Sequence, residues 1–258
     1  MVASLVFDEK YKKLVTTTRE TFEPFYKICS SALLELLKVK EKLIEEVRLD
    51  RDKEFNEAAL LLISRSLQHH ESIFILIERG LYGDAFSIAR NILSDVSMFY
   101  YLHHNPELIP MFIKESDTSY QDDAAFKKAF NEGTIQKNLK VNGHSAPVKS
   151  FQLLSKTAHA SAWGAQLYGT GDRKDPNVFI AKFEPQFESK KALGLLGIIL
   201  SVNWDYLNMV LWHRHHNKLD VNSKFWLGIQ ENVKKLRPLI LGLGEKSEEI
   251  LKGLNGKE

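Results

Sequence analysis

Residues 80–101 read GLYGDAFSIARNILSDVSMFYY, and this stretch sets the expected fold. Gly80 suits the left-handed backbone conformation that ends many helices, and residues 52–79 before it are also helical in pattern. The sequence therefore predicts a helical hairpin that turns at Gly80. In its second helix, apolar side chains recur at three- and four-residue spacing and define one buried face: Ala85, Ile88, Ala89, Ile92, Val96, Phe99 and Tyr100.

Two charged residues, Arg90 and Asp95, interrupt this apolar helix. Asp95 falls beside the buried face, and an ionised carboxylate is costly to bury without a partner. We therefore expect Asp95 to meet a cation or to line a cleft that water reaches.

Helical periodicity extends along most of the chain. Further helices are predicted over about 22–47, 192–212 and 221–241, and no alternating strand pattern is longer than 178–183. We expect an all-α bundle of about six to eight helices in a single domain spanning 1–258, with a core over about 20–241. Glycine and proline predict irregular segments over about 131–149 and 168–185.

Composition limits the classes of protein to consider. The formal net charge is only +2, which disfavours a strongly basic nucleic-acid binder. The single cysteine, Cys29, cannot form an internal disulfide, and the first twenty residues lack the apolar core of a signal peptide, so we expect a cytoplasmic protein.

The most apolar stretch, 192–212, is long enough to cross a membrane. Asn203, Asp205 and Asn208 lie inside it, however, and no second such stretch exists. We therefore expect a central buried helix and no transmembrane segment. Asp205 is expected to contribute a structural polar group there.

A second group of candidate site residues lies after residue 150. A short helix ending near His159 is followed by YGTGDRKDPN at 168–177, which supplies Arg173 and Lys174. Glycines let backbone amides approach an anion, and the two cations add attraction for a phosphate or for RNA. We expect this loop to lie over a site that contains Arg90, Asp95 and His159, with Asp205 as a fourth candidate and with Arg173 and Lys174 binding substrate. The alternatives are a buried ion-pair network that fixes the helix register and a loop that is simply a solvated surface segment.

Nine histidines raise the question of a metal, but their spacing matches no metal-binding motif. The glycine-containing segments do not match a phosphate-binding loop, and no serine or cysteine has the surroundings of a nucleophile. We expect no metal and no cofactor.

The segment RSLQHH at 65–70 fits R-x-x-x-x-H through Arg65 and His70. This motif resembles that of HEPN-type ribonucleases, which are all-helical proteins of bacterial defence and toxin systems. The resemblance implies metal-independent RNA cleavage, with Arg65 holding a phosphate and His70 exchanging protons.

A broader resemblance rests on an apolar helix, the turn GLYGDA, then ARNILSD and FYYL, a distant SKTAH and a final apolar helix. This order resembles an uncharacterised family of bacterial all-helical domains of unknown function, over about residues 50–215. In that family an acidic residue often follows the arginine by four positions, whereas here Asp95 follows Arg90 by five. The resemblance implies a helical fold and a site around Arg90 and His159.

Three classes of function fit these observations. The first is an interaction or regulatory module of a defence or stress system, which binds a partner protein or a second copy of itself. The second is a metal-independent ribonuclease that uses Arg90 and His159, or Arg65 and His70. The third is a histidine-dependent metal-binding or small-molecule-binding protein.

Overall fold

The computed structural model describes residues 2–114, 124–144, 151–152, 154–155, 169–171, 179–181 and 187–242. These residues form eight α-helices, one 3-10 turn and a single pair of very short strands, so the predicted all-α class is confirmed. The elements are α1 (Val2–Arg48), α2 (Lys53–Glu78), α3 (Tyr82–His104), η1 (Pro106–Leu108), α4 (Ile109–Ile113), α5 (Ala124–Ala129), α6 (Glu132–Val141), β1 (Gly169–Gly171), β2 (Phe179–Ala181), α9 (Ser189–His216) and α10 (Lys224–Leu241).

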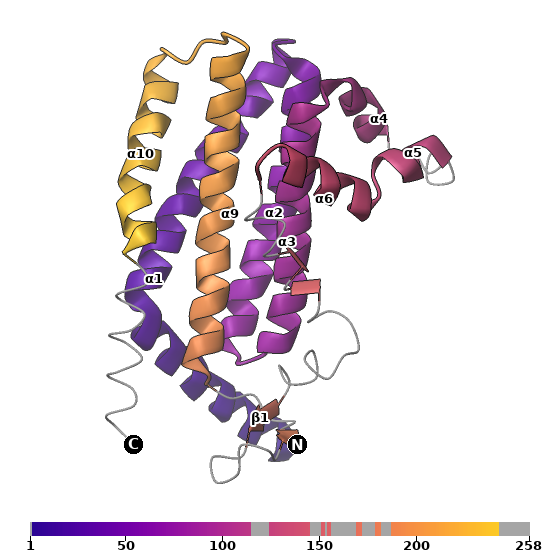
Figure 1. The fold of residues 1–258 in the computed structure, drawn as a ribbon. Coiled ribbons are helices and arrows are strands. Elements are labelled where there is room, and N and C mark those ends of the chain that lie inside the picture. Colours follow the sequence, from indigo (N-terminus) through magenta and orange to yellow (C-terminus); the bar gives the residue numbers. More distant parts are fainter. Residues whose placement is uncertain are drawn as a thin grey trace.

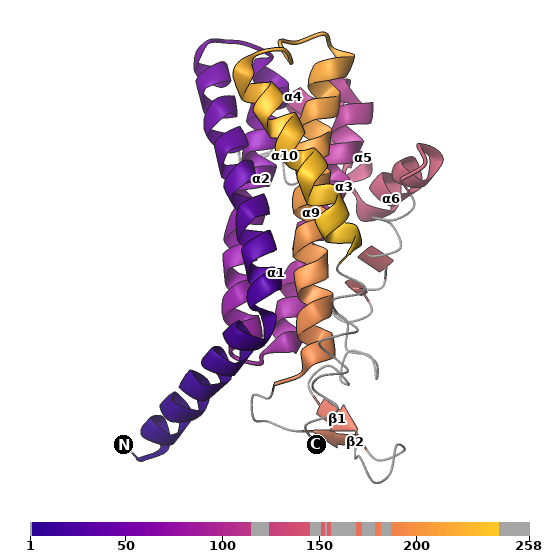
Figure 2. The same ribbon diagram turned by 90° about the vertical axis from the view of Figure 1, so that its left-hand side faces the viewer.

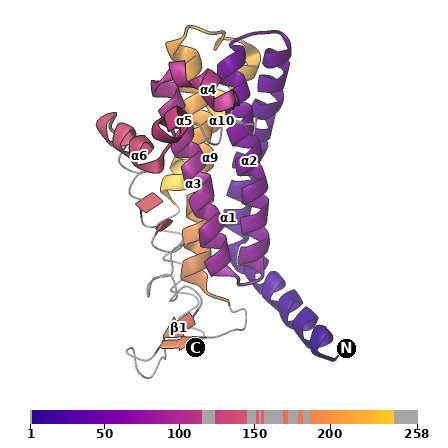
Figure 3. The ribbon, with the colours of Figure 1, turned by 90° about the vertical axis from the view of Figure 1, so that its right-hand side faces the viewer.

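Four long helices, α1, α2, α3 and α9, form the bundle, and α10 packs on its α1–α9 side (Figure 1). The chain runs up α1, down α2 and up α3, and then returns to the far end of the bundle to run up α9. Consequently α3 and α9 are parallel neighbours. Part of the long connection between them forms α4, α5 and α6 (Figure 3). Of these, α4 contacts α2, α6 contacts α3, and α5 contacts α6.

The long apolar helix α9 lies centrally, as the sequence predicted. It packs on α1, α3 and α10, and it also contacts α2. In the part of the chain that the structure describes, it is the one helix long and apolar enough to cross a membrane, and 61% of that apolar stretch is buried within the fold. A helix in the core of a protein can have the same length and apolar composition, so these two properties do not by themselves indicate a membrane span. Its fully buried hydrophobic side chains are Ala192, Leu195, Leu196, Ile199, Leu200, Val202, Tyr206 and Leu207.

The turn between α2 and α3 confirms the role predicted for Gly80. This residue has φ +70°, and its N–H donates to the carbonyl of Ile77. The N–H of Leu81 donates to the carbonyl of Leu76. These two bonds form a Schellman motif, which satisfies the last carbonyls of α2 and starts the hairpin.

Helix α1 is longer than predicted. It begins at Val2 rather than near residue 22, and it bends at Phe22, where the backbone leaves helical geometry with φ −109° and ψ 17°. Pro24 explains the bend, since its ring lacks an N–H and crowds the carbonyl four residues earlier. Figure 2 shows the first part of α1 projecting from the bundle below this bend.

The stretch predicted to be irregular over about 131–149 contains α6. Asn131 caps its start by accepting a hydrogen bond from the N–H of Thr134 at 2.9 Å. At its end, Gly143 has φ +83°, and the N–H of His144 donates to the carbonyl of Leu139. Asn142 and Gly143 are therefore a helix cap rather than a loop. In the second stretch expected to be irregular, β1 pairs antiparallel with β2.

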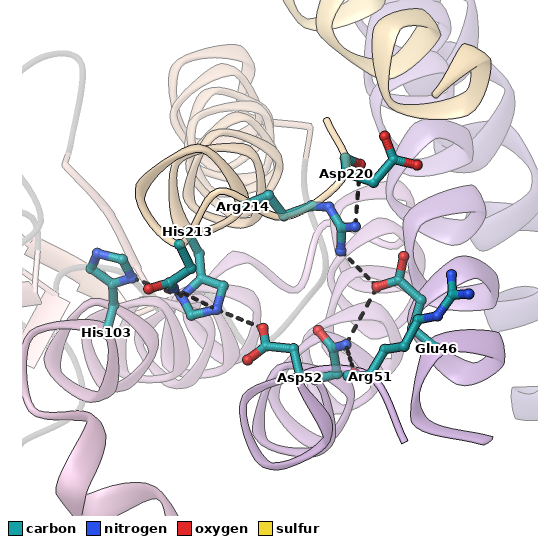
Figure 4. A network of polar contacts seen from close by, with 9 residues as sticks. Glu46, Arg51, Asp52, His103, His213, Arg214 and Asp220 are labelled. Atoms are coloured by element: carbon teal, nitrogen blue, oxygen red, sulfur yellow. Dashed lines mark hydrogen bonds and ion pairs between the residues drawn. The ribbon is translucent and has the colours of Figure 1, made fainter. Parts of the chain in front are cut away.

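A buried network joins the ends of three helices at the top of the bundle (Figure 4). Arg214 of α9 donates to Glu46 of α1 at 2.6 Å and to the carbonyl of Asp220 at 3.3 Å. Its guanidinium also lies 4.2 Å from the ring centre of Trp226 of α10. Both charged side chains are about 5% exposed, so each needs the other as a partner.

We expect Arg214→Ala to lower the free energy of unfolding by about 3–5 kcal/mol, because it leaves the Glu46 carboxylate buried and unpaired. Urea unfolding followed by far-UV circular dichroism measures this change. The double variant Glu46→Gln/Arg214→Met removes both charges and should lose less stability than Arg214→Ala. Equal or greater loss in the double variant would contradict the unpaired-charge explanation.

Candidate functional site

The structure pairs Asp95 of α3 with Arg65 of α2. Nε of Arg65 donates to Oδ2 of Asp95 at 3.1 Å, and Nη2 donates to Oδ1. The carboxylate side chain is only 1% exposed, whereas the arginine side chain is 59% exposed. The expectation that Asp95 meets a cation is therefore confirmed, and that cation comes from the neighbouring helix of the hairpin.

Around this ion pair is a surface pocket of about 290 Å³. Arg65 and His69 reach it from α2, and Asn91, Ser94 and Asp95 reach it from α3. Residues three or four positions apart share a helix face, so the two antiparallel helices present these five side chains to one space. A guanidinium, an imidazole, an amide and a hydroxyl line the pocket, which makes it rich in hydrogen-bond donors.

The electrostatics of the pocket follow from unequal burial of the pair. Burial raises the pKa of Asp95, and the hydrogen bonds and charge of Arg65 oppose that rise. The cation faces solvent while its counter-ion lies beneath it. An incoming ligand therefore meets the arginine first.

Arg90 does not share these contacts. Its Nη2 donates to Glu132 of α6 at 3.1 and 3.3 Å, and its Nε donates to Ser155 at 3.2 Å. The guanidinium also lies 4.9 Å from the ring centre of Phe151. Five residues along a helix turn two side chains roughly 140° apart, which explains why Arg90 and Asp95 meet different groups. Arg90 ties α3 to the segments that follow it.

Three of the predicted site residues, His159, Arg173 and Lys174, lie outside the described residues. Their predicted proximity to Arg90, and the predicted role of the 168–177 loop, therefore stay predictions.

His70 of the R-x-x-x-x-H segment faces the core. It has no exposed surface, and its Nδ1 lies 2.6 Å from the carbonyl oxygen of Ser66. Burial lowers the pKa of His70 to about 4, so the ring is neutral at pH 7. The histidine that shares the pocket with Arg65 is His69, one position earlier. Sequence reasoning missed His69, Asn91 and Ser94, although their spacing from Arg65 and Asp95 was a usable signal.

Asp205 lies on the α3–α9 side of the bundle. The hydroxyl of Tyr100 donates to its Oδ1 at 3.2 Å, and burial raises the pKa of Asp205 to about 6. Asp205 thus forms a polar contact between two parallel helices, consistent with its predicted structural role.

Histidines from three parts of the chain meet near the top of this same side. Nε2 of His104 lies 2.9 Å from Nε2 of His144, and their ring centres are 5.1 Å apart, so the two nitrogens point at each other. This is the geometry of an N–H···N hydrogen bond, whereas a metal needs both lone pairs to point at a third position. Among the described residues, no three histidine, cysteine or acidic side chains have a metal-binding arrangement.

The burial of His70 gives a testable dependence of stability on pH. The folded pKa of about 4 lies below the ordinary value of 6.5, so the unfolded chain binds a proton between these values and the folded chain does not. This contribution is present above pH 6.5 and is lost as the pH falls toward 4. We expect the loss of this contribution to lower the free energy of unfolding by about 2 kcal/mol between pH 7.5 and pH 5.

The variant His70→Asn isolates this contribution, because its amide can still donate to the Ser66 carbonyl but does not titrate. Urea unfolding at the two pH values should show a smaller acid loss in the variant than in the wild type. Identical losses in both proteins would rule out His70 as a source of acid sensitivity.

Comparison with known proteins gives one match. Residues 56–145 match the model of a family of unknown function (DUF5677). No curated protein and no solved structure matches the chain. The matched residues include α3 and all of α2 except its first three residues, and hence every side chain of the Arg65–Asp95 pocket. His159 lies beyond them. The resemblance to an uncharacterised helical family is therefore confirmed over residues 56–145, a match that carries no known activity.

Proposed function

We propose that this protein is an interaction module that binds a partner protein through the outer face of α2 and the Arg65–Asp95 pocket. The observation that carries this proposal is the exposed guanidinium of Arg65, which is held by a buried carboxylate at a donor-rich pocket. An arginine fixed in this way is already ordered, so it loses little conformational freedom when it binds an acidic side chain of the partner.

The outer face of α2 supplies apolar contacts on both sides of the arginine. Leu61 is 50% exposed and lies one helical turn before Arg65, and Ile75 is 44% exposed and lies further along. Leu61, Arg65, Gln68 and Ile75 are spaced by four, three and seven residues, so they form one stripe along the helix. Arginine beside apolar residues is typical of the centres of protein interfaces.

The alternative is a ribonuclease whose active site would be the same pocket. General acid–base cleavage of RNA requires proton-exchanging side chains at the phosphate. His70 lies in the core and Asp95 is bound to Arg65, so a catalytic role in this pocket would fall to His69. Among the residues that the structure describes, the pocket thus offers a single side chain, His69, for proton exchange. A single proton-exchanging group supports binding better than it supports catalysis.

Photo-crosslinking in cells tests the interaction. A photoreactive amino acid in place of Gln68 should give a covalent adduct with a partner protein, and the same residue in place of Lys234 on α10 should not. We expect Arg65→Glu to reduce the adduct at least about tenfold, because a charge-assisted hydrogen bond contributes roughly 1.5–3 kcal/mol. Arg65→Lys should reduce it less, since it keeps the cation but loses the two-pronged geometry.

Arg19→Ala is the matched control, because Arg19 is also an exposed arginine with two hydrogen bonds to one carboxylate, Glu78. It should leave the adduct unchanged. Equal crosslinking from the Gln68 and Lys234 positions would contradict the proposed face. RNA cleavage that survives a chelator and is lost in His69→Ala would replace the proposal by the ribonuclease.

A further inference from the structure

A second pocket, of about 470 Å³, lies between the projecting part of α1 and the end of α2. It is lined by Tyr11, Lys12, Val15 and Thr16 of α1 and by Arg79, the residue that follows α2. Arg79 is fourteen positions after Arg65, and the two pockets share no lining residue.

The bend of α1 and one ion pair create this space. The bend at Phe22 directs the first part of α1 away from the bundle, which opens an angle between α1 and α2 (Figure 2). Just before the bend, Arg19 donates to both carboxylate oxygens of Glu78, at 2.7 and 2.9 Å. A two-pronged contact of this kind fixes orientation as well as distance. The pocket therefore lies where the bent helix α1 diverges from the end of α2.

The charge of the pocket is positive. Lys12 and Arg79 line it, and no acidic side chain is among the described residues that do so. The nearby carboxylate of Glu78 is held by Arg19. Two cations on one concave surface attract an anion more strongly than the small net charge of the whole chain does.

The side chain of Arg79 is not needed to end α2. The last carbonyls of that helix accept hydrogen bonds from the backbone N–H groups of residues 79–81. The Arg79 guanidinium instead lies 5.9 Å from the ring centre of Tyr11. This contact places the cation over an aromatic wall of the pocket.

We propose that this pocket binds a nucleoside phosphate, with Lys12 and Arg79 contacting the phosphate oxygens and Tyr11 and Val15 packing against the base. The hydroxyl of Thr16 supplies a further hydrogen-bond donor. A volume of about 470 Å³ falls within the range of small-molecule sites. The aromatic and aliphatic wall distinguishes a nucleotide from a bare phosphate, for which cations alone suffice.

Isothermal titration calorimetry with ATP, inorganic tripolyphosphate and adenosine separates the two halves of the ligand. We expect ATP to bind, tripolyphosphate to bind more weakly and adenosine not to bind detectably. Binding of ATP should weaken as sodium chloride is added, because screening reduces the attraction between exposed charges.

Arg79→Ala and Lys12→Ala should each weaken ATP binding at least about tenfold, the equivalent of one charge-assisted hydrogen bond. Lys13→Ala is the matched control, since Lys13 is an exposed neighbour of Lys12 that does not line the pocket. Arg65→Ala is a second control and should retain ATP binding. Circular dichroism confirms that each variant is folded.

Several results would overturn the proposal. The first is that the wild type does not bind ATP, and the second is that it binds ATP and tripolyphosphate with equal affinity. The third is that Lys13→Ala and Arg79→Ala lose equal affinity for ATP. Loss of ATP binding in Arg65→Ala alone would move the nucleotide site to the other pocket. A failure of the partner-binding proposal leaves these measurements unaffected, since the two pockets use different side chains.

Discussion

The ion pair between Glu46 and Arg214 is the constraint on which the arrangement of the long helices depends. These two residues are 168 positions apart, and the contact sets the register of α9 against α1 at one end of the bundle. Removal of either charge leaves the other buried, so a shifted register is penalised strongly. Asp52 and His213 add a contact of 2.7 Å one residue away along α9. The α1–α2 turn is thereby held against the same helix end.

Much of the fold was accessible from the sequence, because helical periodicity is a local signal. The turn at Gly80 followed from one residue type, and the central position of α9 followed from its apolar composition. The bend of α1 and the helix α6 were harder to predict. A proline such as Pro24 can start a helix or bend one, and the packing of the chain decides between the two. In the same way, a pair such as Asn142–Gly143 can belong to a loop or can cap the end of a helix.

The candidate site was less accessible, because it depends on which face each side chain takes. Asp95 was expected to need a cation, but only the relative placement of α2 and α3 shows that Arg65 provides it. Adjacent residues on a helix point about 100° apart, so His69 reaches the pocket whereas His70 enters the core. A sequence motif identifies neither direction. Whether its histidine faces the core or the surface depends on how the neighbouring helices pack around it.

The parallel arrangement of α3 and α9 has a consequence for the order of folding. Helices α1, α2 and α3 are joined by short turns, so they can associate soon after they leave the ribosome. Helix α9 is synthesised much later, after the long connection that contains α4, α5 and α6. Until it docks, Glu46 lacks its arginine, and the apolar side chains of α1 and α3 that α9 covers stay open to water. The stage of folding before α9 docks is therefore the stage at which the chain is most prone to aggregate, because transiently exposed apolar surface favours contacts between chains.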